Sequence, residues 1–196
     1  MKKGTVIWIV IAAVVAMVIV WGISVHNRIV VAEESVTTQW ANVESQYQRR
    51  TDLIPNLVST VKGYAAHESQ TLQAVVDARA KATQTTIDPS HLTEAEMQHY
   101  QAVQGEVSSA LSRLLMVVEN YPDLKANQNF LSLQNQLEGT ENRISVERQK
   151  FNETVKVFNA MIRRFPNSII AGYGQFTVKA YFAADAGAEK APEVTF

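Results

Sequence analysis

Residues 130–165, FLSLQNQLEGTENRISVERQKFNETVKVFNAMIRRF, contain a column of apolar side chains in which each member lies seven residues from the last. A seven-residue apolar repeat predicts a helix that packs nearly parallel or antiparallel to other helices with a left-handed supercoil. The column consists of Phe130, Leu137, Ile144, Phe151, Phe158 and Phe165. A companion column contains polar residues, among them Glu147, which either pairs with Arg143 or Arg148 near the seam or lies on a solvated flank.

A second helix is predicted upstream of this column. Thr93 followed by Glu96 three residues later forms a capping box that opens a helix. Residues 120–123, Asn-Tyr-Pro-Asp, turn the chain after it. The apolar positions of this helix are Met97, Tyr100, Val103, Val107, Leu111, Leu114 and Val118.

A third pattern precedes that helix, with apolar residues at alternating spacings of four and three. Its members are Val36, Trp40, Val43, Tyr47, Ile54, Leu57, Val61 and Tyr64, and it continues through Leu72, Val75 and Val76 towards Ala82. The stripe keeps its phase across Pro55, which favours a kink over a break. Pro55 and Gly63 together leave open whether the bundle has three or four long helices.

An uncharged run from Thr5 to Val25 lies before the bundle, with Trp8 and Trp21 near its two ends. As a helix it is about 30 Å long, enough to cross a bilayer once, and it exceeds the apolar region of a secretory signal. We therefore predict an uncleaved transmembrane anchor. Because residues 28–35 contain neither Gly nor Pro, the membrane helix should run with little interruption into the first bundle helix.

Charge sets the expected orientation and excludes one class of partner. Lys2, Lys3 and the amino terminus outweigh Arg28 on the other side of the anchor, so the positive-inside rule places the N-terminus in the cytoplasm and the bundle outside. Beyond Arg28 the chain carries 15 basic and 19 acidic residues. This excess of acid gives no electrostatic reason to bind nucleic acid and disfavours broad adhesion to an anionic leaflet. The absence of cysteine excludes disulfides and thiolate chemistry.

Histidines and carboxylates do not form a catalytic pattern. His67 and Glu68 begin like a zinc-protease helix, but Thr71 stands where the second histidine is needed. His91 and His99 lie two turns apart and are expected at the surface or in caps. Residues 49–52, Arg-Arg-Thr-Asp, form the densest charge cluster of the first helix, and we expect them to form a self-paired, solvated turn.

The sequence changes character after Pro166, becoming rich in Gly, Ala and Pro. Phe176, Val178, Ala180 and Phe182 alternate with more polar residues, which is typical of a strand. A single strand is not stable in water, so it must lie on the bundle, pair with another subunit or stay mobile. The segment from Asp185 to Thr195 is the better candidate for a loose tail.

Long ordered matches make the chain resemble the LemA family of bacterial membrane proteins. The matches are residues 48–58 (QRRTDLIPNLV), 60–65 (TVKGYA), His67-Glu68, Ala78-Arg79, 119–126 (ENYPDLKA), 129–131, 137–144 (LEGTENRI), Arg148, Phe151-Asn152, Phe158-Asn159, Phe165-Pro166 and Ile170-Ala171-Gly172, preceded by Trp40. One departure is residues 26–30, HNRIV, where the family tends to have Tyr-Asn-x-Leu-Val. The resemblance implies a single N-terminal anchor followed by an antiparallel bundle of long helices. It implies no agreed catalytic activity and, by analogy alone, a membrane-bound protease as a partner.

The predicted protein is all-α: an anchor over residues 1–28, a bundle of three to four long helices over 29–165, and a short aromatic, β-like tail over 166–196. We expect a non-enzymatic scaffold in the bacterial cytoplasmic (inner) membrane that forms a homo-oligomer with coiled-coil character and needs no metal or other cofactor. The alternative is an adaptor or sensor for a membrane-bound protease. The candidate interaction surface comprises Arg49, Arg50, Asp52, His67, Tyr173, Phe176 and Phe182.

Overall fold

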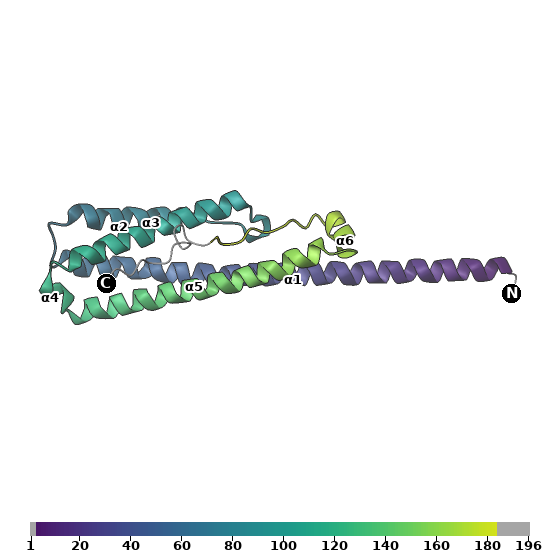
Figure 1. Cartoon of the computed structure of the whole chain (residues 1–196), viewed down its shortest axis with the longest axis horizontal. Helices are drawn as coiled ribbons and strands as arrows, with labels where there is room; N and C mark the ends of the chain where they lie inside the picture. The colour runs from purple at the N-terminus through teal and green to yellow at the C-terminus, as the bar shows by residue number, and fades with distance from the viewer. Residues whose placement is uncertain (1–2, 184–196) are drawn as a thin grey trace, which may run out of the picture.

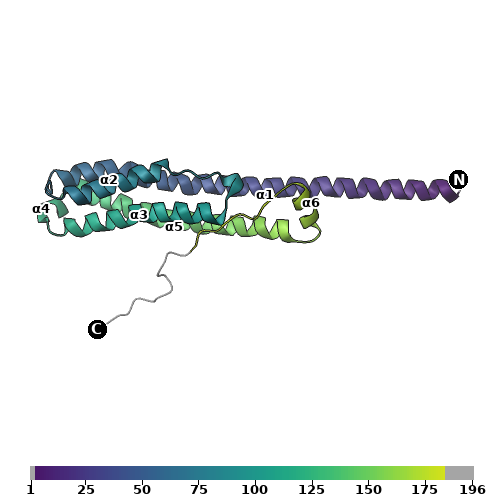
Figure 2. The ribbon, with the colours of Figure 1, turned by 90° about the horizontal axis from the view of Figure 1, so that it is seen from above.

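The structure, a computed structural model, describes residues 3–183 of the chain and shows an all-α protein built on one very long helix (Figures 1 and 2). The predicted loose tail from Asp185 to Thr195 lies outside the described residues. Helix α1 (Lys3–Lys62) has 60 residues and no interruption. At a rise of 1.5 Å per residue it is about 90 Å long. The prediction that the membrane helix continues into the bundle is confirmed.

The first part of α1 projects from the bundle as a single rod (Figure 1). Every side chain from Lys3 to Trp21 is exposed, although an 18-residue window here has a mean hydropathy of 2.9. Among the described residues α1 is the one helix long and apolar enough to cross a membrane. An apolar rod that buries nothing within the protein fits a single-pass membrane anchor, because lipid supplies the apolar surroundings it lacks.

Pro55 lies inside α1 without ending the helix. A proline has no N–H, so it leaves the carbonyl of the residue four positions earlier, Thr51, without its helical donor. The Arg79 side chain from the next helix fills this gap, with its Nε donating to the Thr51 carbonyl at 2.8 Å. The break comes instead at Gly63. Tyr64, expected in the buried stripe, is 46% exposed, because the helix has ended and Ala65 is buried in its place.

Three further long helices complete an antiparallel four-helix bundle (Figures 1 and 2). They are α2 (Ser69–Gln84), α3 (Glu94–Val118) and α5 (Gln128–Arg163). A 3₁₀ turn, η1 (Pro89–His91), joins α2 to α3, and the short α4 (Pro122–Lys125) joins α3 to α5. The predicted capping box opens α3, with the Glu96 N–H donating to Thr93 Oγ1 at 3.3 Å and the Thr93 N–H donating to the Glu96 carboxylate at 3.0 Å. The hydrogen bond from the Thr93 side chain lowers the pKa of Glu96.

The seven-residue column of α5 forms the core along α1, with one exception. Phe130, Leu137, Ile144, Phe151 and Phe158 are all buried. Phe165 is 82% exposed, because α5 ends at Arg163 and the helical repeat no longer directs it at a partner. Glu147 in the companion column accepts hydrogen bonds from Gln39 of α1 and from Lys150, rather than lying free on a flank. These bonds, that of Lys150 first, lower the pKa of Glu147.

The last described segment turns back along the bundle. A short helix, α6 (Asn167–Tyr173), packs against the end of α5 and against α1. A turn at residues 174–175 follows, and residues 176–183 then run extended over the bundle (Figure 1). No strand occurs within residues 3–183. The segment that was predicted to be β-like is extended but has no sheet partner there. Of the three fates considered for it, the structure shows the first. Phe182 is 4% exposed and Lys179 is 1% exposed against the bundle.

Candidate interaction site

Arg50 is one of two charged residues, with Lys179, that the described part of the fold buries almost completely. It lies between Tyr47 and Ile54 on the inward stripe of α1, and its exposed fraction is 1%. Thr51 is also buried, whereas Arg49 and Asp52 on the outer face are exposed. The prediction of a solvated, self-paired turn is therefore wrong for Arg50 and Thr51, because the inward stripe of α1 passes through both positions regardless of the charge of Arg50.

Two neighbouring helices compensate the charge of Arg50. From α5, Glu141 accepts from Nη1 at 2.9 Å. From α3, the Ser108 hydroxyl accepts from Nη1 at 2.9 Å, and Gln104 accepts from Nη2 through its side chain at 2.6 Å and its carbonyl at 3.2 Å. The guanidinium also lies over the Tyr47 ring, 5.1 Å from its centroid. Arg50 thus fixes α1, α3 and α5 in one register.

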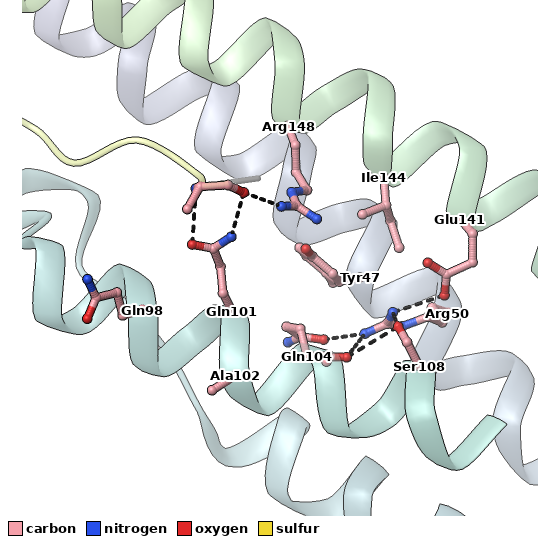
Figure 3. A pocket seen from close by; sticks show the side chains of 12 residues that line it. Tyr47, Arg50, Gln98, Gln101, Ala102, Gln104, Ser108, Glu141, Ile144 and Arg148 are labelled. Atoms are coloured by element: carbon pink, nitrogen blue, oxygen red, sulfur yellow. Dashed lines mark hydrogen bonds and ion pairs between the residues drawn. The ribbon is translucent and has the colours of Figure 1, made fainter. Parts of the chain in front are cut away.

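An open cleft of about 470 Å³ lies over this cluster between α1, α3 and α5 (Figure 3). Arg50, Gln104 and Ser108 line it together, and the Glu141 carboxylate, 42% exposed, connects the buried charge with solvent. Its further lining residues are Tyr47, Gln98, Gln101, Ala102, Gly105, Ile144, Arg148 and Ala183. Ala183 belongs to the tail, so the tail forms part of the lining of the cleft.

Side-chain carboxamides hold the tail where a sheet would use a neighbouring strand. Asn159 accepts from the Lys179 N–H and donates to the Lys179 carbonyl, both at 2.9 Å. Asn152, two helical turns earlier, does the same for Phe182 at 2.8 and 3.0 Å. Gln101 on α3 repeats the pattern at Ala183, at 3.2 and 3.1 Å. Each of these three carboxamides bonds to backbone atoms only. The groove that they form, called the tail groove below, therefore binds the extended backbone and not a particular side chain.

Two tail side chains add sequence specificity to this groove. Phe182 stacks on Trp40 at 5.8 Å and meets Phe151 edge-on at 5.4 Å, with the Arg148 guanidinium 5.0 Å from its ring centroid. Lys179 is buried, donates to Glu33 of α1 at 2.6 Å and to the Ser90 carbonyl, and lies 5.5 Å from the Phe158 ring. The groove therefore takes a cation and an aromatic ring spaced three residues apart.

The predicted interaction residues do not form one surface. Arg49 and Asp52 are exposed on the bundle part of α1, and His67 is exposed in the turn before α2. Tyr173 is 88% exposed at the opposite end, next to the anchor. Phe176 is half-buried, with its ring 5.4 Å from that of His26. Arg50 and Phe182 are buried, which corrects their expected place at the surface; partner binding by the exposed residues stays a prediction.

Sequence reasoning missed the carboxamides that hold the tail. Phe151-Asn152 and Phe158-Asn159 repeat the same pair seven residues apart, so both asparagines had to lie on one face of α5. That repetition was a usable signal.

One buried tyrosine in this region has a shifted pKa. Burial raises the pKa of Tyr100, whose ring packs against Trp40 and Tyr47. Within residues 3–183, no three His, Asp or Glu side chains are grouped so that they could hold a metal ion.

Comparison with known proteins gives a consistent result. The model of the LemA family matches residues 39–196. The magnetosome protein MamQ of Magnetospirillum gryphiswaldense is 24% identical over 174 residues, covering 80% of this chain and 64% of that protein. Protein LemA of Metamycoplasma hominis is 21% identical over 145 residues, covering 74% of this chain and 63% of that protein. The match thus spans somewhat less than two thirds of each of these relatives.

Proposed function

The chain belongs to the LemA family, and we propose that it is a non-enzymatic, membrane-anchored scaffold that assembles as a homo-oligomer in the bacterial cell envelope. The observation that carries this proposal is the unbroken α1. A continuous helix transmits the orientation of the anchor to the bundle, whereas a flexible linker would only tether it. The buried polar cluster at Arg50 supports the same reading, since such clusters set the register of packed helices.

The orientation of the scaffold is part of the proposal. Lys2 and Lys3 precede the anchor, whereas Arg28 alone follows it before Glu33 and Glu34. This asymmetry supports a cytoplasmic N-terminal side and an extracytoplasmic bundle in the inner membrane.

Cysteine crosslinking in native membranes tests the assembly. The natural chain has no cysteine, so each introduced thiol reports on one position. Val18→Cys lies on the exposed anchor and Met116→Cys on the exposed face of α3, whereas Val107→Cys is buried and serves as the control. We expect disulfide-linked dimers from at least one exposed position and none from the control. A monomeric mass of the solubilised wild-type protein, together with no crosslinked species, would contradict the proposed homo-oligomer.

A second candidate function, an adaptor for a membrane-bound protease, is favoured by the tail groove. Its carboxamides bind extended backbone, the conformation in which a strand-adding partner also binds. The test is purification of the wild-type protein and of Asn152→Ala/Asn159→Ala, which lacks the two groove carboxamides, from native membranes. Enrichment of a membrane protease with the wild type, and its loss with the variant, is the expected result. Recovery of no protease with either protein would contradict the adaptor role.

A further inference from the structure

The end of the bundle lies beside the anchor instead of above it (Figure 1). Ile170 of α6 packs so close to Gly22 that a Cβ added to this glycine would lie 3.6 Å from the isoleucine Cδ1. Gly22 belongs to the apolar run from Thr5 to Val25. If that run spans the hydrocarbon core, α6 lies at the level where hydrocarbon meets headgroups.

The outer surface of the chain at this level is apolar and aromatic. Phe165 is 82% exposed, Ile169 49% and Tyr173 88%. Aromatic rings are favoured at the headgroup level of a bilayer, where an apolar body and a polar edge are both accommodated. These side chains therefore fit a bilayer surface far better than water.

A basic crevice opens at the same level between α1 and the end of α5. Its volume is about 460 Å³, and Arg28, Lys156 and Arg164 line it over an apolar floor that includes Val25 and Val157. Within residues 3–183 none of the three cations forms an ion pair. Glu153 is the one carboxylate among the lining residues, and it accepts a hydrogen bond from Gln149 at 3.4 Å. The crevice thus keeps an excess of positive charge.

An apolar groove of about 750 Å³ adjoins this crevice along the anchor. Val20 and Ile23 line its membrane side, and Val31, Val157 and Met161 continue it above the anchor. Arg28, Val157 and Met161 line both hollows, so the basic crevice and the apolar groove lie directly next to each other.

We propose that this juxtamembrane hollow binds one anionic phospholipid of the bilayer, with the phosphate at Arg28, Lys156 and Arg164 and an acyl chain along Val20 and Ile23. The site matches both halves of such a molecule, a charged head and an apolar tail. Because the rest of the bundle is acidic, the attraction is confined to this site instead of spreading over the surface. The proposal rests on the membrane anchoring proposed above and adds a defined ligand to it.

Native mass spectrometry of the full chain, released from vesicles of phosphatidylcholine and phosphatidylglycerol, tests the site. Wild type should retain phosphatidylglycerol over phosphatidylcholine by at least about tenfold, since each of the three basic residues near the headgroup favours the anionic lipid. Arg28→Gln/Lys156→Gln/Arg164→Gln should remove the preference, whereas Arg28→Lys/Arg164→Lys should keep it. The matched control Arg49→Gln/Lys62→Gln/Arg113→Gln removes the same charge from exposed positions elsewhere on the bundle and should behave like wild type.

The outcomes separate this site from membrane anchoring itself. If wild type resists carbonate extraction from membranes but retains both lipids equally, the lipid site is wrong and the anchor stands. If wild type is extracted, the anchor fails as well. Equal loss of preference in the control triple variant would overturn the site, as would displacement of the lipid by millimolar inorganic phosphate, which would indicate a site for the free anion. Circular dichroism of each variant verifies that the bundle is folded.

Discussion

Arg50 is a full positive charge placed among three helices, and its surroundings determine whether it stabilises them. Four hydrogen bonds to Ser108, Glu141 and Gln104 satisfy its two terminal nitrogens, while its Nε has no partner among the described residues. A buried ion is tolerated only when nearly all of its hydrogen-bonding capacity is used. Arg50 is close to that limit, so it fixes the arrangement of helices more than it adds net stability.

Replacing Arg50 by alanine should destabilise the bundle strongly. Loss of the guanidinium leaves Gln104 and Ser108 without their partner and opens a cavity, which costs about 2–4 kcal/mol. Arg49→Ala, one residue away but exposed, should change the free energy of unfolding by no more than about 0.5 kcal/mol. Urea unfolding of both variants, followed by far-UV circular dichroism, measures the difference. Equal stability of the two variants would contradict the structural role of Arg50.

The spacing of apolar residues along α1 could predict that Arg50 is buried, but it could not predict which residues Arg50 contacts. The apolar stripe of α1 skips one member between Tyr47 and Ile54, and Arg50 stands where that member belongs. Its charge argued for a solvated position, and tertiary packing outweighed that preference. Glu141 and Gln104 come from helices far away in the sequence, so no local pattern identifies them as its partners.

At the scale of the helices, Pro55 and Arg79 act as a pair. Pro55 removes the donor that Thr51 O would have within α1, and Arg79 of α2 replaces it across the helix interface. This pairing lets one helix continue through a proline and at the same time docks α2 on α1. Sequence alone left the choice between Pro55 and Gly63 open, because the compensating donor lies 28 residues away.

A double-mutant cycle tests this pairing. Arg79→Met in the natural chain leaves a carbonyl without its donor and should cost about 1–3 kcal/mol. In a Pro55→Ala background the new N–H at position 55 satisfies Thr51 O, so the same change should cost about 1 kcal/mol less. Thermal unfolding of the four proteins yields the coupling energy. Additive effects would show that Arg79 does not compensate for the proline.

The tail shows what a two-residue periodicity can and cannot predict. Alternation from Phe176 to Phe182 indicated an extended segment, and the structure confirms extension. The alternation could not show what the extended segment pairs with. In the structure the carboxamides of Asn152 and Asn159 supply the hydrogen bonds that a neighbouring strand would give. This pairing is a tertiary contact between α5 and the tail, so the two-residue periodicity of the tail alone cannot predict it.

Each asparagine should protect one tail amide from hydrogen exchange. Asn159→Ala should speed exchange of the Lys179 N–H, and Asn152→Ala that of the Phe182 N–H, each by about tenfold or more, since local opening governs such exchange. Asn135→Ala changes the same residue type at an exposed position of α5 and is the matched control. Exchange measured by mass spectrometry on the full chain reports all three variants. Unchanged protection in both test variants would show that the aromatic contacts alone hold the tail.

At the scale of the whole molecule, α1 makes anchor and bundle one body. No flexible linker separates the anchor part of α1 from its bundle part, and α6 packs beside the anchor at the base of the bundle (Figure 2). A bundle that is continuous with a membrane-spanning anchor cannot swing freely around its attachment. Whatever it binds must approach a surface whose distance from the bilayer is fixed.

The side of the membrane on which the bundle stands follows from few charges, so it should respond to changing them. A membrane-impermeant maleimide should label Met116→Cys in intact spheroplasts and Gly4→Cys only after permeabilisation, because the lysines before the anchor are retained inside. Both positions are exposed, so neither result reflects burial. In a Lys2→Glu/Lys3→Glu background the labelling of Met116→Cys in intact cells should fall, since the charge difference that orients the anchor is reversed. The opposite pattern in the natural sequence would place the bundle in the cytoplasm, where Arg28 and the basic crevice would face the inner leaflet.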